Sequence, residues 1–341
     1  MLLALDLDGT LLTTDKRLTQ RNIEAITRAQ DAGTTVVLAS GRHPYSMARY
    51  ADALHLRKRG GYVLAFNGAQ LYDYPTGKLL FQQHLPLHIL PRLRDWARRY
   101  SLPMLSFRGP IEAPTIISEM PEDHYVVENA ANNLMNVEGV DDIAEALAAL
   151  PTPPPKCLLP GPPELLPEVE AAMKADLAGE IAIYRSAPHY LELVPLGIDK
   201  GQTLLRLKAH LGLNQTNLPI PSLTKATVPD ASALAATVPG ASASGATIAD
   251  ASALEATVPG TSAPGSTLPG TSAQEATIAP ALIACGDQDN DIPMLRVADI
   301  GVAMGNAAAN VKAAADFVTL HCDNDGVAHA IDHLILNPNT K

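Results

Sequence analysis

The sequence has few aromatic residues and few cationic residues. Aromatic residues make up 4% of the 341, and 25 Lys and Arg residues face 36 Asp and Glu residues, for a net charge of −11. A chain this acidic repels polyanions, so we expect no nucleic-acid partner.

The three cysteines, Cys157, Cys285 and Cys322, are widely spaced and form no CxxC pattern. This excludes a disulfide framework and a zinc cluster, and it favours a reducing compartment.

Long hydrophobic runs are also missing. A membrane span needs about 20 apolar residues, and no segment approaches that length. The opening run, residues 1–5, is interrupted by Asp6 and Asp8 and follows no basic segment, unlike a signal peptide. Hydrophobic residues nevertheless make up 47% of the chain, which is enough for a packed core. We therefore expect a cytoplasmic protein without a membrane partner, built from two domains or from one domain with an insertion.

A ten-residue repeat occupies residues 227–279. Its five full copies read TVPDASALAA, TVPGASASGA, TIADASALEA, TVPGTSAPGS and TLPGTSAQEA. The repeat has no aromatic residue and few large apolar ones, so it cannot bury enough surface to offset the entropy of ordering. This composition favours a flexible linker. A small β-solenoid is the alternative, although alanine fills half of its core positions. No protein partner of the repeat can be identified from the sequence.

Outside the repeat, short apolar runs alternate with helix-period segments, which predicts an α/β fold with a parallel sheet. Residues 2–5 and 34–38 are predicted strands, separated by a helix that Thr19 caps. The pattern changes between residues 81 and 194, which predicts a second α/β domain inserted into the first. The predicted divisions are core segments 1–80, 195–214 and 281–341, an inserted domain 81–194, and a low-complexity decapeptide-repeat insertion 215–280.

Polar residues follow the predicted strands of the core and begin the helix after residue 199. They are Asp6, Asp8, Ser40, Gly41, Arg42, Lys200, Asp287, Asn290 and Asp291. The carboxyl ends of parallel strands meet at one edge of a sheet, where ligands bind. Carboxylates gathered at one point favour a cation such as Mg²⁺. Lys200 and the Ser40 hydroxyl supply the positive charge and the donors that a phosphate requires, so the sequence predicts a phosphorylated ligand.

Four of these segments resemble the motifs of the haloacid dehalogenase superfamily of phosphatases. They are DLDGTLL at 6–12, ASGR at 39–42, GIDKG at 197–201 and GDQDNDIPML at 286–295. FNGA at 66–69, SAPHYLELVP at 186–195, GVAMGNA at 301–307 and DGVAHAI at 325–331 resemble the Cof-type sugar-phosphatase branch. The resemblance implies a Rossmann-like parallel core with a type IIB α/β cap between the second and third motifs.

The resemblance also implies a role for each residue. Asp6 would be the nucleophile that forms an aspartyl-phosphate, and Asp8 would act first as general acid and then as general base. The protein ligands of Mg²⁺ would be the carboxylates of Asp6 and Asp287 and the backbone carbonyl of Asp8, with Asp291 behind them. The phosphate oxygens would be bound by Ser40, Gly41, Lys200, Asn290 and the backbone N–H of Leu7.

The leaving-group side is less defined by the sequence. Asn67 and Gly68 are expected to line it, while Arg42 is expected either at the substrate or in a surface ion pair. The cap would set the substrate, with one of Arg185, Ser186 and His189 touching the leaving group.

These features predict a Mg²⁺-dependent phosphatase of small phosphorylated metabolites, above all sugar phosphates. A phosphosugar mutase of the same superfamily is an alternative within enzymes. A scaffold or interaction protein, with the repeat as the functional part and an inactive core, is an alternative of another class. The repeat follows a helix and precedes a strand, at the amino edge of the sheet, so we expect it to leave the ligand-binding edge open.

Overall fold

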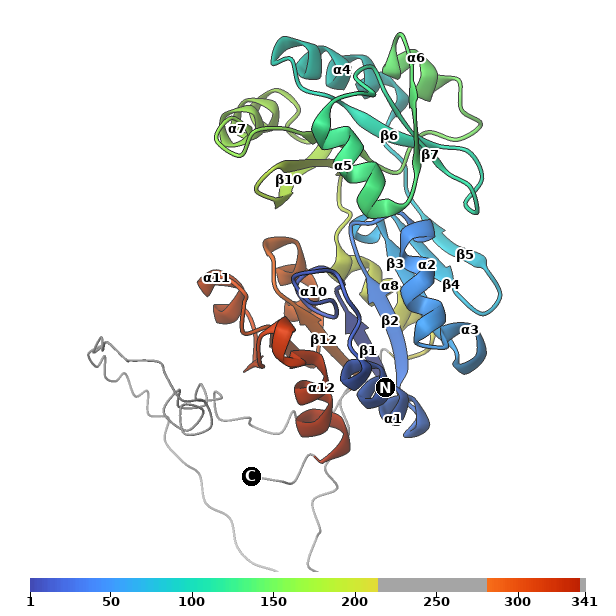
Figure 1. The fold of residues 1–341 in the computed structure, drawn as a ribbon, viewed down its shortest axis with the longest axis vertical. Helices are drawn as coiled ribbons and strands as arrows, with labels where there is room; N and C mark the ends of the chain where they lie inside the picture. The colour runs from blue at the N-terminus through green and yellow to red at the C-terminus, as the bar shows by residue number, and fades with distance from the viewer. Residues whose placement is uncertain (214–280, 338–341) are drawn as a thin grey trace, which may run out of the picture. The chain divides into compact units, whose positions relative to one another are not determined.

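The computed structural model describes residues 1–213 and 281–337 (Figure 1). The predicted repeat at 227–279, and the whole of the insertion predicted at 215–280, lie outside these residues. Among the described helices, none has the length and apolar character needed to cross a membrane.

An eight-stranded sheet forms the core, and its central strands come from both ends of the chain. β1 (Leu2–Leu5) lies between β12 (Leu282–Gly286) and β2 (Thr35–Ala39), and all three run parallel. The order across the sheet is β14 (Phe317–Val318), β13 (Ile300–Ala303), β12, β1, β2, β3 (Gly61–Ala65), β4 (Gln70–Asp73) and β5 (Lys78–Gln82). The parallel arrangement brings the carboxyl ends of β1, β2, β3 and β12 to one edge.

The core sheet is mixed, which corrects the expectation of a parallel sheet. β4 and β5 pair antiparallel to their neighbours. Only residues 66–69, which include the 3₁₀ turn Phe66–Gly68, separate β3 from β4, and residues 74–77 separate β4 from β5. A parallel connection needs a crossover of a dozen or more residues, so connections this short force the chain to reverse.

Helices cover both faces of the core sheet. On one face lie α1 (Gln20–Asp31), α2 (Pro44–Ala53), α3 (Leu56–Arg59) and α12 (Gly326–Ile331). On the other lie α8 (Lys200–His210), α10 (Ile292–Val297) and α11 (Ala309–Ala313). The predicted cap of α1 is confirmed, because the Thr19 hydroxyl accepts from the backbone N–H of Asn22.

The strands between Leu105 and Pro195 form a second sheet of six strands (Figure 1). Its order is β10 (Ile181–Ala187), β11 (Tyr190–Pro195), β9 (Cys157–Pro160), β6 (Leu105–Arg108), β7 (Thr115–Ser118) and β8 (Asn136–Gly139). α4 (Leu90–Arg99), α6 (Ile143–Ala148) and α7 (Leu166–Asp176) pack on one face, and α5 (His124–Asn133) packs on the other. We call the part from α4 to β11 the cap.

The start of α8, where Lys200 lies, packs closely against α10 at Gly201. A Cβ on Gly201 would collide with the backbone carbonyl of Pro293. Overpacking of this kind costs about 1–3 kcal/mol, so we expect Gly201→Ala to lower the free energy of unfolding by that amount in a urea titration. The exposed neighbour offers a matched control, since Gln202→Ala should change stability by less than about 0.5 kcal/mol. Equal stability of the two variants would contradict this prediction.

Candidate active site

Three buried carboxylates meet at the carboxyl edge of the core sheet. Asp6 follows β1, Asp287 follows β12, and Asp291 ends the 3₁₀ turn Asp289–Asp291. One oxygen from each lies within 4.8 Å of the others. Asp291 Oδ2 accepts from the backbone N–H groups of Asp287 (2.9 Å) and Gln288 (3.0 Å), which fixes the loop after β12. The structure thus brings together three of the four residues predicted as metal ligands.

Lys200 joins two of these acids from the first turn of α8. Its Nζ lies 2.6 Å from Asp6 Oδ1 and 2.6 Å from Asp291 Oδ1, and its side chain is fully buried. Burial alone would lower the pKa of Lys200, but the charges of Asp291 and Asp6 outweigh it and raise that pKa. Lys200 is therefore a permanent cation beside Asp6.

One ammonium does not balance three carboxylates. Burial and the charge of Asp291 raise the pKa of Asp6 well above its usual range, although Lys200 opposes the shift. The same two causes raise the pKa of Asp287 to about 6. An all-oxygen donor set with excess negative charge is what a hard divalent cation requires, so these residues fit Mg²⁺.

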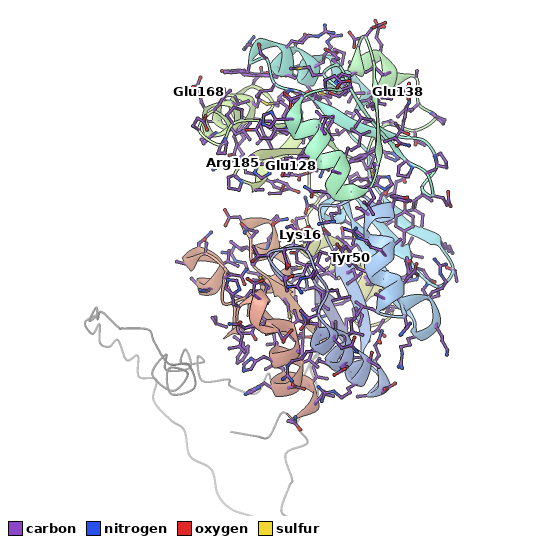
Figure 2. The ribbon with its side chains drawn as sticks, in the orientation of Figure 1. Lys16, Tyr50, Glu128, Glu138, Glu168 and Arg185 are labelled. Atoms are coloured by element: carbon purple, nitrogen blue, oxygen red, sulfur yellow. The ribbon has the colours of Figure 1, made fainter. Side chains whose placement is uncertain are left out.

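Asp8 is placed differently from the other acids. Its side chain pairs with Arg42 through two contacts of 2.7 Å and with Lys16 Nζ at 2.7 Å. Burial opposes ionisation, but these two cations outweigh it and hold the pKa of Asp8 well below its usual range. Arg42 is therefore a partner of Asp8, and at 11% side-chain exposure it is not in a surface pair. Lys16 comes from the loop after β1 (Figure 2).

The loop after β2 carries Ser40, Gly41 and Arg42 to the same edge. Ser40 is buried, and its hydroxyl accepts from the backbone N–H of Arg42 at 3.2 Å. The backbone carbonyl of Ser40 accepts from the N–H of Asn67 at 2.9 Å, so the loops after β2 and β3 support each other. Asn290 Nδ2 donates to Asn67 Oδ1 at 3.0 Å. Asn67 thus links two predicted phosphate-binding segments.

Leu7 and Gly68 contribute to the packing around the site. The Leu7 side chain belongs to the hydrophobic core, so only its backbone can contribute to the site. At Gly68 φ is +105°, and a Cβ there would press against the carbonyl of Asp199. The Gly68 carbonyl accepts from Thr203 Oγ1 at 2.8 Å. Gly68 therefore allows α8 to approach the loop after β3, which places Lys200.

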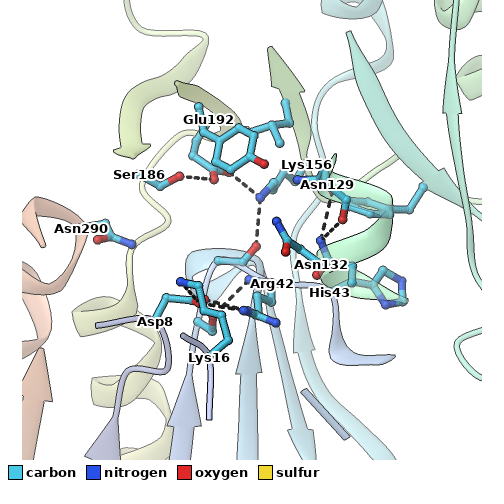
Figure 3. Close-up of a pocket in the computed structure, with 16 residues that line it drawn as sticks. Asp8, Lys16, Arg42, His43, Asn129, Asn132, Lys156, Ser186, Glu192 and Asn290 are labelled. Atoms are coloured by element: carbon cyan, nitrogen blue, oxygen red, sulfur yellow. Dashed lines mark hydrogen bonds and ion pairs between the residues drawn. The ribbon is translucent and has the colours of Figure 1, made fainter. Parts of the chain in front are cut away.

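A cavity of about 150 Å³ lies next to Asp8 and Ser40, between the core loops and the cap (Figure 3). On the core side it is lined by Asp8, Lys16, Ser40, Gly41, Arg42, His43 and Asn290. On the cap side it is lined by Phe107, Asn129, Asn132, Asn133, Lys156, Leu158, Ser186, Tyr190 and Glu192. The cap lining is mostly uncharged and polar, with one ion pair between Lys156 and Glu192.

Of the three cap residues expected near the leaving group, only Ser186 lines this cavity. Arg185 on β10 instead pairs with Glu170 at 2.8 Å, and its side chain is labelled in Figure 2. His189 packs instead against its neighbour Tyr190, with the two ring centroids 4.2 Å apart.

Lys156 and Glu192 line the cavity and were not selected from the sequence. Glu192 is a charged residue in the otherwise apolar stretch YLELVP, and this interruption is the signal that could have identified it. Lys156 precedes an apolar strand and carries no comparable signal.

Comparison with known proteins agrees with this arrangement. A family model described as haloacid dehalogenase-like hydrolase matches residues 3–218 and 278–331. A putative phosphatase, YxeH, of Bacillus subtilis is 25% identical over 338 residues, covering 98% of each chain. An HMP-PP phosphatase of Serratia proteamaculans is 24% identical over 342 residues, covering 99% of this chain and 96% of its own.

Solved structures give the same result. A haloacid dehalogenase-like hydrolase from Bacteroides thetaiotaomicron matches with a TM-score of 0.71 and 31% identity, covering 98% of this chain and 99% of its own. A sugar phosphatase of haloacid dehalogenase subclass IIB has the same fold, with a TM-score of 0.65 and 19% identity over 97% of this chain and 98% of its own. The family resemblance noted in the sequence is confirmed: the chain belongs to the haloacid dehalogenase-like hydrolases.

Proposed function

We propose that this protein is a Mg²⁺-dependent phosphatase of small phosphorylated metabolites, above all sugar phosphates, working through an aspartyl-phosphate on Asp6. The observation that carries the proposal is the buried cluster of Asp6, Asp287, Asp291 and Lys200. A neighbouring cavity suited to the leaving group adds support. Relatives named as phosphatases, among them a 5-amino-6-(5-phospho-D-ribitylamino)uracil phosphatase of Bacillus subtilis, favour the same reaction class.

In the first step, a carboxylate oxygen of Asp6 attacks phosphorus and the bond to the leaving oxygen breaks. Asp8 gives its proton to that oxygen, so the leaving group departs as an alcohol. In the second step, Asp8 takes a proton from water, which attacks phosphorus and releases inorganic phosphate and free Asp6. In the observed arrangement Asp8 is held ionised by Arg42 and Lys16, the form needed as base. Protonation as acid requires these contacts to loosen.

The remaining site residues bind the phosphate group and neutralise its negative charge. The phosphate oxygens would be held by Lys200, Ser40, Gly41, Asn290 and the backbone N–H of Leu7. The residues that would hold Mg²⁺ are Asp6, Asp287 and the Asp8 carbonyl, with Asp291 orienting them. When bound, the ion would neutralise negative charge on the phosphoryl group.

The cap lining supports a polyhydroxylated leaving group. The amides of Asn129, Asn132 and Asn133 and the hydroxyls of Ser186 and Tyr190 can each exchange hydrogen bonds with sugar hydroxyls. Lys156 and Glu192 neutralise each other at 2.6 Å. The cap side of the cavity therefore offers hydrogen bonds rather than a free charge.

The first test replaces the proposed nucleophile. Asp6→Asn should lower kcat by at least about 10⁴-fold, because an amide oxygen cannot form the acyl phosphate. Phosphate release from sugar phosphates, nucleotides, flavin mononucleotide and pyridoxal phosphate measures this loss. Asp15→Asn, on an exposed side chain, is the matched control and should keep full activity. Comparable turnover by Asp6→Asn would refute the role of Asp6, and transfer to a second substrate position without phosphate release would favour a mutase.

A second test separates the acid role of Asp8 from phosphate binding. Asp8→Asn should slow hydrolysis of alkyl phosphates by about 10²–10⁴-fold. Hydrolysis of p-nitrophenyl phosphate should fall much less in the first step, because nitrophenolate leaves without a proton. Burst-phase measurements resolve that first step. Equal loss for the two substrates in the burst would show that Asp8 is not the acid.

The metal site is tested by thermal stability and by activity. Mg²⁺ at 100 times its Kd should stabilise the folded protein by about 2.7 kcal/mol, seen as a rise in Tm. Asp287→Asn should abolish this rise, whereas Asp289→Asn, outside the carboxylate cluster, should retain it. Activity should disappear with EDTA and return with Mg²⁺. A wild-type Tm independent of Mg²⁺, together with activity in EDTA, would contradict the proposed metal dependence.

A further inference from the structure

A lysine of the cap reaches directly into the phosphate-binding loop of the core. Lys156 precedes β9, and its Nζ donates to the backbone carbonyl of Gly41 at 2.9 Å (Figure 3). The same Nζ lies 2.6 Å from Glu192 Oε2 on β11. The backbone carbonyl of Lys156 accepts from Ser106 Oγ at 2.7 Å. The cap therefore holds both ends of this residue while its ammonium contacts the core.

This ion pair is buried, which makes its placement informative. The side chains of Lys156 and Glu192 are 6% and 4% exposed. Glu192 is held further by Ser186 Oγ, which donates to Oε1 at 2.6 Å. Removing two charges from water is costly, and an apolar pair would often pack as well or better. Stability alone therefore does not explain the pair, whereas an ammonium at Gly41 does.

The neighbouring histidine cannot take over this contact as a cation. His43 is buried and its Nδ1 accepts from the backbone N–H of Tyr45. Burial, and then the charge of Lys156, lower the pKa of His43 to about 3. At neutral pH His43 is uncharged.

The Gly41 carbonyl and the Arg42 N–H belong to one planar peptide group, so fixing one fixes the other. The Arg42 N–H donates to Ser40 Oγ at 3.2 Å. Lys156 on one side of this peptide and Ser40 on the other therefore form a continuous chain of hydrogen bonds. The Ser40 hydroxyl, a phosphate ligand in the proposed function, is thus linked to the cap through one peptide group.

We infer that Lys156 is a positioning residue that ties the cap to the phosphate-binding loop and orients Ser40 through the Gly41–Arg42 peptide. This inference rests on the proposed function for its kinetic consequences. The tie itself is a structural property that can be measured without turnover.

The test compares Lys156→Met with Lys156→Arg, which keeps the charge. Lys208 provides the matched control, because it is also a buried lysine paired with an acid, Asp299, but contacts no residue of the phosphate-binding loop in the described structure. Lys156→Met should lower kcat and weaken inhibition by inorganic phosphate, each about 10- to 100-fold, the effect of losing one charged hydrogen bond. Lys156→Arg should recover most of both, and Lys208→Met should change neither.

Hydrogen exchange of peptides covering residues 38–47 reports the tie directly. Lys156→Met should accelerate exchange in this segment, whereas Lys208→Met should not. If Lys156→Met fails to fold, Lys156→Met combined with Glu192→Met replaces the pair by apolar side chains and removes the uncompensated charge. That double variant should still show fast exchange and weak phosphate inhibition.

Wild-type-like exchange at residues 38–47 in folded Lys156→Met, or in the folded double variant, would overturn the inference. So would matched losses in the Lys156→Met and Lys208→Met variants, because these would reflect stability alone. Failure of the proposed function is a separate result: the wild type would release no phosphate from any substrate, while the exchange experiment would still report whether Lys156 holds the loop.

Discussion

The site depends on one buried ammonium placed between two carboxylates. Lys200 has no exposed side-chain surface, so its charge is tolerable only with Asp6 and Asp291 both at 2.6 Å. These residues come from α8, from the end of β1 and from the loop after β12. Removing one partner of a buried pair costs about 3–5 kcal/mol, because the remaining charge stays buried. The interaction that assembles the site therefore also joins three distant parts of the chain.

The convergence of these segments could be predicted because it follows from a simple rule. Asp6, Ser40 and Asp287 each follow a short apolar run, and parallel strands place their carboxyl ends at one edge. The pairing of Asp8 with Arg42 could not be predicted in the same way. Asp6 and Asp8 are both strand-end acids two residues apart, and only the folded loop shows that one meets Lys200 and the other meets Arg42.

Two further features were missed for different reasons. The antiparallel direction of β4 and β5 follows from the short connection that precedes each strand. The contact between Lys156 and Gly41 has no local signal at all. It joins residues 115 positions apart and exists only because the cap packs on the core loops. Long-range side-chain contacts of this kind are set by tertiary packing, which no strand or helix pattern encodes.

The loop at Ser40–His43 is where the two parts of the molecule become electrostatically dependent on each other. On its core side, Arg42 is fixed by Asp8, and on its cap side Gly41 is fixed by Lys156. By contrast, Ala281 lies at the opposite end of β12 from Asp287, roughly 20 Å away at about 3.3 Å per residue. The amino end of β12 is thus remote from this loop. A change of cap position acts on the loop directly at two places: at the Gly41 carbonyl, which Lys156 holds, and at the His43 ring, whose centroid lies 5.1 Å from that of Phe107 on β6.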